Sequence, residues 1–148
     1  MRKRHMLTEA KGQYLFQLAL MTPLLLALMG LVADGGVAYA RYRHALNAVD
    51  VAAQAAAQSV DTAYFIQTNQ VRLSVGEATS AGWWYGWVNG QGSGVQITGV
   101  EVIPPRTVLV YAQTELPTIF MRALGFPNQV ITVVGKAHST YGIRDELP

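Results

Sequence analysis

The chain has 148 residues, of which 51% are hydrophobic and only 14% are charged, and its formal net charge is +2. Residues 1–12 carry four basic residues against one acidic residue, whereas residues 13–148 carry seven against eight, so the cations sit at the N-terminal tip and not on the following domain. This distribution excludes nucleic acid as an expected partner, and the absence of cysteine excludes disulfides, thiolate nucleophiles and cysteine metal sites.

The first predicted element is a membrane-spanning helix over residues 13–36. The chain has 22 consecutive uncharged residues over 12–33, and about 20 apolar helical residues cover the roughly 30 Å of a hydrocarbon core. The basic leader, residues 1–12, predicts a cytoplasmic N-terminus. Asp34 marks the outer edge of the span, and Pro23 lies inside it, where a proline tends to kink a helix.

Two other interpretations of this segment stay open. The first is a secretory signal peptide, because Ala38-Tyr39-Ala40 fits the small-x-small cleavage pattern. The apolar run is longer than the about 7–15 residues of an ordinary signal peptide. The second is a plain single-span anchor that is never processed.

Short motifs follow one another in order along the first 53 residues: Gly12-Gln13, Pro23, Asp34-Gly35-Gly36, Tyr39-Ala40-Arg41 and Asn47-Ala48-Val49-Asp50-Val51-Ala52-Ala53. This ordered set resembles the N-terminus of TadE/TadG-like proteins, the pilin-like subunits of tight-adherence (Flp, type IV) pilus systems. TadE-like is the closer comparison, because the chain is too short for the large extra domain of TadG-type proteins. The resemblance implies that a prepilin-peptidase-like enzyme cuts between Gly12 and Gln13.

The resemblance also implies roles in helix packing and assembly for Gln17, Pro23 and Asp34. The family usually has glutamate five residues after the cut, and this chain has Gln17 there. An amide can hydrogen-bond to a neighbouring helix, but it loses the charge-assisted pairing that a carboxylate makes with a free amine.

The span is predicted to continue as a helix over residues 37–62, with a break at the Gly35-Gly36 pair. Leu46, Val49 and Ala53 recur at helical spacing on a stripe of mostly small residues. This stripe packs either on the chain's own sheet or on the helix of a neighbouring subunit, and both alternatives stay open.

Residues 64–94 are predicted to form an irregular loop rich in tryptophan and glycine, since residues 82–94 alone contain three Trp and five Gly. Trp83, Trp84 and Trp87 either cover the apolar face of the small domain or form an exposed patch that binds a subunit or the membrane interface.

A three- to four-stranded antiparallel sheet is predicted over residues 95–141. The alternation of apolar residues changes phase at Gly99, which indicates a β-bulge. The other predicted elements are a turn at Pro104-Pro105, a strand over 106–114, a short helix within 116–127, a strand over 129–137 and a tail over 142–148. The fold class is therefore α+β, with a long N-terminal helix and an extracytoplasmic domain over 37–148.

No arrangement of residues predicts catalysis, a metal site or a cofactor, because the three histidines have no ligand spacing and no serine lies in a nucleophile motif. The resemblance implies a non-enzymatic minor pilin or pseudopilin of the bacterial cytoplasmic membrane, single-pass, with the C-terminal domain outside and incorporation into a pilus. Its expected partners are the membrane, the processing peptidase, other pilin-like subunits and pilus assembly proteins. The alternative is an unprocessed, membrane-anchored binding module.

Overall fold

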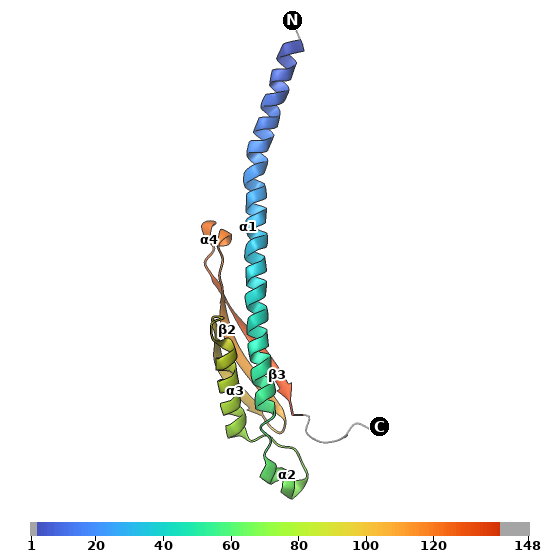
Figure 1. Ribbon diagram of the computed structural model, residues 1–148, viewed down its shortest axis with the longest axis vertical. Coiled ribbons are helices and arrows are strands. Elements are labelled where there is room, and N and C mark those ends of the chain that lie inside the picture. The colour runs from blue at the N-terminus through green and yellow to red at the C-terminus, as the bar shows by residue number, and fades with distance from the viewer. Residues whose placement is uncertain (1–2, 140–148) are drawn as a thin grey trace, which may run out of the picture.

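The computed structural model of the chain describes residues 3–139, with side chains from Gly12 onward. Its elements, shown in Figure 1, are α1 (Lys3–Ala57), α2 (Thr62–Thr68), α3 (Val75–Gly90), β1 (Val95–Ile103), β2 (Thr107–Leu116), α4 (Phe120–Ala123) and β3 (Gln129–His138). The fold is α+β, as predicted: a long apolar helix is followed by a three-stranded antiparallel sheet with one short helix between its last two strands. The predicted tail lies outside the described residues.

Helix α1 runs without interruption for 55 residues and includes Pro23. The predicted break at Gly35-Gly36 is wrong. Both glycines are exposed, and a Cβ added at either of them would have no neighbour within 4 Å, so no contact bends the chain there. Glycine lowers helix propensity by only about 1 kcal/mol, which the alanine-rich flanks offset.

The first helix ends at Ala57, earlier than the predicted residue 62. Its last turn tightens, as Gln58 and Ser59 donate backbone hydrogen bonds to carbonyls three residues earlier. Asp61 then caps a separate helix, α2, because its side chain accepts a hydrogen bond from the Tyr64 amide at 2.9 Å. The segment predicted to continue the first helix is therefore divided between the end of α1 and the start of α2.

The sheet has the order β1-β2-β3, and both pairs are antiparallel. The predicted bulge is confirmed, because the β1–β2 register shifts between Ile97 and Gly99. The predicted turn at Pro104-Pro105 joins β1 to β2, and its peptide bond is cis. The third strand begins at the predicted residue and extends to His138.

The core lies between the second half of α1 and the sheet, and it is built from small side chains. Val49, Val108, Val110 and Thr114 are the largest side chains that are fully buried. Gly135 in β3 lies against the backbone carbonyl of Val49, so helix and strand approach closely.

The predicted stripe on α1 packs on the chain's own sheet. Val49 and Ala53 are fully buried, and Leu46 is half-buried against the same core. This settles the two alternatives for Val49 and Ala53, because a side chain without exposed surface cannot reach a neighbouring subunit.

The predicted irregular loop over 64–94 is wrong, because most of that segment is α2 and α3. The buried face of α3 consists of Ala78, Gly82, Gly86 and Gly90, spaced four residues apart. A Cβ on Gly86 would lie 2.7 Å from the Ile97 side chain. These glycines do not break the helix. Because they have no side chains, α3 packs closely on β1 and α1 through the face that they form; Figure 1 shows α3 beside α1.

Candidate functional site

The N-terminal part of α1 is an exposed apolar rod, and we call residues 12–33 the shaft. A window of this helix has a mean hydropathy of 2.1, so within the described residues one helix is long and apolar enough to cross a membrane. Gly12 and Gln13 begin the shaft, and Gln17 and Pro23 also lie on its exposed surface. Large side chains such as Phe16 and Val32 are exposed as well.

Asp34 lies at the end of the shaft, and it is 4% exposed. Its carboxylate Oδ1 accepts a hydrogen bond from the Ile119 amide at 2.9 Å, and its Oδ2 accepts one from the Met121 amide at 2.8 Å. We call this arrangement the Asp34 clamp. The Asp34 carboxylate caps the N-terminus of α4. The residue at the N-cap position is Ile119, and its side chain makes no capping hydrogen bond.

A second contact holds α4 to α1 one turn before the clamp. Gly30 is buried, and a Cβ there would overlap the ring of Phe120. An apolar groove of about 290 Å³ opens between the two helices. Its lining residues are Leu24, Ala27, Leu28, Leu31, Phe120, Met121 and Leu124. The connection between β2 and β3, together with the adjoining ends of the two strands, is thereby fixed beside the shaft, and we call residues 116–130 the hairpin tip.

The three tryptophans of α3 point outward, because the opposite face of the helix packs on the core. Trp83, Trp84 and Trp87 are each about half exposed, and the rings of Trp84 and Trp87 lie 5.6 Å apart between centroids. Of the two predicted alternatives, an exposed aromatic patch describes Trp84 and Trp87 better than a covered apolar face does. Trp83 and Trp87 also line a shallow hollow with Val95 and Ile97.

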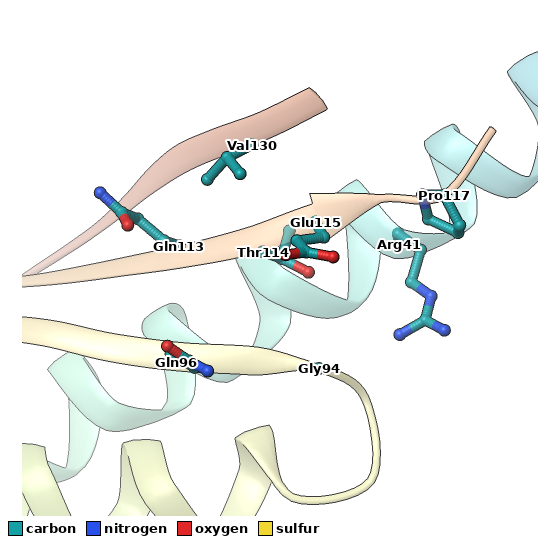
Figure 2. A pocket seen from close by; sticks show the side chains of 8 residues that line it. All are labelled: Arg41, Gly94, Gln96, Gln113, Thr114, Glu115, Pro117 and Val130. Atoms are coloured by element: carbon teal, nitrogen blue, oxygen red, sulfur yellow. The ribbon is translucent and has the colours of Figure 1, made fainter. Parts of the chain in front are cut away.

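A polar cleft of about 460 Å³ opens where α1 passes the sheet, and Figure 2 shows its lining side chains. Arg41 reaches across from α1 and donates a hydrogen bond to the Ser93 carbonyl, which ties the α3–β1 loop to the long helix. Thr114 is 2% exposed, and its hydroxyl has no hydrogen-bond partner among the described residues. Glu115 is the acidic residue of the cleft.

The cleft holds one cation and one carboxylate, which is too little to define a reaction. In the part of the chain that the structure describes, no group of three or more His, Asp or Glu side chains could hold a metal ion. The arrangement that the fold builds most completely is therefore the shaft with its clamped hairpin tip.

Comparison with known proteins gives no matching family model, no matching curated protein and no matching solved structure.

The sequence predicted Asp34 at the outer edge of the apolar span but did not predict its hydrogen-bond partners. Ile119 lies 85 positions away along the chain. No local pattern couples such distant residues. A signal for the hairpin tip was present, however: from Leu116 to Gly135 the only charged residue is Arg122.

Proposed function

We propose that this chain is a membrane-inserted, pilin-like structural or assembly subunit: a minor pilin or pseudopilin of a tight-adherence pilus or a related secretion apparatus. The observation that carries the proposal is the exposed shaft, which continues directly into the helix that forms the domain core. Large exposed apolar side chains along this rod require cover by lipid or by neighbouring helices. The ordered motifs from Gly12-Gln13 to Ala53 add support from resemblance.

In the proposed mechanism the basic leader keeps the N-terminus in the cytoplasm during insertion. A prepilin-peptidase-like enzyme then removes the leader after Gly12. Subunits pack side by side through their shafts, because the part of α1 after Asp34 already covers the core of its own domain. The Gln17 amide contributes interhelical hydrogen bonding of about 0.6–2 kcal/mol in lipid.

The mature N-terminus tests this proposal. The native polypeptide is extracted from membranes and its intact mass is measured. A chain that begins at Gln13 supports the pilin-like subunit, and Gly12→Ala should prevent the cut. Gly36→Ala is the matched control, since Gly36 is an exposed glycine in the same helix with open space around it. A chain that begins at Arg41 would show a secreted domain and refute the proposal.

A second candidate function is an unprocessed, membrane-anchored binding module. The outward aromatic face of α3 favours it, because exposed tryptophans are common at interface centres. A native chain that retains Met1, with Trp84→Ala abolishing capture of a partner while membrane insertion persists, would support the binding module over the pilin-like subunit.

A further inference from the structure

If the shaft spans the membrane as proposed, the position of α4 along α1 gives the depth of α4 in the bilayer. Lys11 is the last charged residue before the uncharged run. A helix needs about 20 residues to cross the hydrocarbon core, and counting from Gly12 reaches Leu31. The groove under α4 is lined by Leu24, Leu28 and Leu31 of this same run. Helix α4 is therefore level with the outer half of the bilayer and not beyond it.

The side chains of the hairpin tip suit that depth. Ile119 is 70% exposed and Leu124 is 69% exposed, and Phe126 and Val130 are also more than half exposed. They face away from the core, so folding of this chain does not bury them. Arg122 is the only charge, and its long side chain can extend toward the lipid headgroups.

Most backbone amides of the hairpin tip donate hydrogen bonds within the protein, as the hydrocarbon of a membrane requires. A backbone N–H in hydrocarbon must find its acceptor within the protein. Internal acceptors are found by the amides of Thr118, Ile119, Met121, Ala123, Leu124, Gly125 and Phe126. Pro117 and Pro127, on either side, have no N–H to satisfy. Asp34 provides two of these acceptors from the neighbouring helix.

The opposite end of the domain carries an ion pair. Helix α2 lies there, far from α4 in Figure 1, and Asp61 near its start forms an ion pair with Arg72 at 2.6 Å. The exposed apolar side chains of the hairpin tip thus lie on the side of the domain from which the shaft leaves.

We infer that the hairpin tip inserts into the outer leaflet of the membrane beside the shaft, so that the subunit contacts lipid through two segments. The Asp34 clamp joins these segments and supplies the acceptors for two amides of the tip, those of Ile119 and Met121, inside the bilayer. The inserted tip fixes the rotation and the height of the domain above the membrane before assembly. This inference rests on the proposed span and adds a lipid-binding surface to it.

Site-specific fluorescence tests the inference on the full chain in phosphatidylcholine vesicles. Because the chain has no native cysteine, Phe126→Cys introduces one labelling site for an environment-sensitive probe. Leu20→Cys in the shaft is the positive control, and Gln67→Cys in α2 is the negative control; both positions are exposed. Quenching is compared between lipids spin-labelled on the acyl chain and on the headgroup.

We expect acyl-chain quenching at Phe126 to be several-fold stronger than at Gln67 and comparable to that at Leu20. Quenching at Leu20 without quenching at Phe126 would refute the inserted tip and leave the spanning shaft intact. An absence of quenching at both positions would refute the span itself. A probe at Phe126 that is shielded from water but unquenched by either lipid would show protein as the occupant and overturn the inference.

A second variant tests the clamp. Asp34→Ala leaves the Ile119 and Met121 amides without their acceptors, so the tip should withdraw and the probe at Phe126 should lose its acyl-chain quenching. The probe at Leu20 should be unaffected. Unchanged quenching at Phe126 in this variant would show that the clamp does not hold the tip in the leaflet.

Discussion

Replacing Gly135 with alanine perturbs the closest approach between α1 and the sheet. Gly135 faces the backbone of Val49, and an added Cβ would overlap the Val49 carbonyl group and lie 2.9 Å from the Asp50 nitrogen. A helix backbone cannot rotate aside as a flexible side chain can. Strand β3 and α1 must therefore separate, and the core between them loses contacts on both sides.

Overpacking of this kind costs about 1–3 kcal/mol. Each kcal/mol lowers Tm by about 4–8 °C in a domain of about 60–100 residues. We therefore expect Gly135→Ala to lower the Tm of the folded domain by about 4–24 °C. The assay is thermal unfolding of the full chain in detergent micelles, followed by circular dichroism at a wavelength sensitive to the sheet.

Gly76→Ala is the matched control. Gly76 lies in α3, and a Cβ there has no neighbour within 4 Å, so its Tm should stay the same or rise. If Gly135→Ala unfolds at the temperature of the unmodified chain, α1 does not lie as close to β3 as described, and the small-residue packing of this core is refuted.

Three further predictions concern polar side chains of the domain. The hydrogen bond from Arg72 lowers the pKa of Asp61, so this carboxylate stabilises the fold above its unfolded-state pKa, and the stabilisation is lost as the pH falls through the lower folded-state pKa. Below about pH 4, the Tm of the Asp61→Asn variant should therefore decrease less steeply with falling pH than the Tm of the unmodified chain. Thr114→Val should raise stability by about 1 kcal/mol, because it removes a buried hydroxyl without a partner; a lower Tm would contradict this. Arg41→Ala should speed hydrogen exchange of the amides over residues 91–94 and leave the strand amides unchanged, as measured by mass spectrometry.

The elements that the sequence predicted well are those in which a local pattern matches the local structure. The uncharged run predicted the exposed helix, and the phase change at Gly99 predicted the bulge between β1 and β2. Helix α3 was missed because its glycines were counted as loop residues. Their spacing at 82, 86 and 90, with Ala78 one turn earlier, is helical and was the available signal.

The candidate site was predictable only in part. Asp34 stood out as a charge at the end of an apolar run, but its hydrogen bonds to Ile119 and Met121 depend on how the β2–β3 hairpin folds back along α1. That return is a property of the whole sheet and not of any short segment. The pairing of Gly30 with Phe120 was hidden for the same reason.

The smallness of the core side chains changes how mutational data on this protein should be interpreted. The four largest fully buried residues are three valines and a threonine. Truncation to alanine removes few atoms at such positions, whereas at the buried glycines of α3 and β3 alanine adds a Cβ that would overlap its neighbours. An alanine scan would consequently find the buried glycines less tolerant than the buried valines, whereas substitution by leucine or phenylalanine would find both kinds of position intolerant.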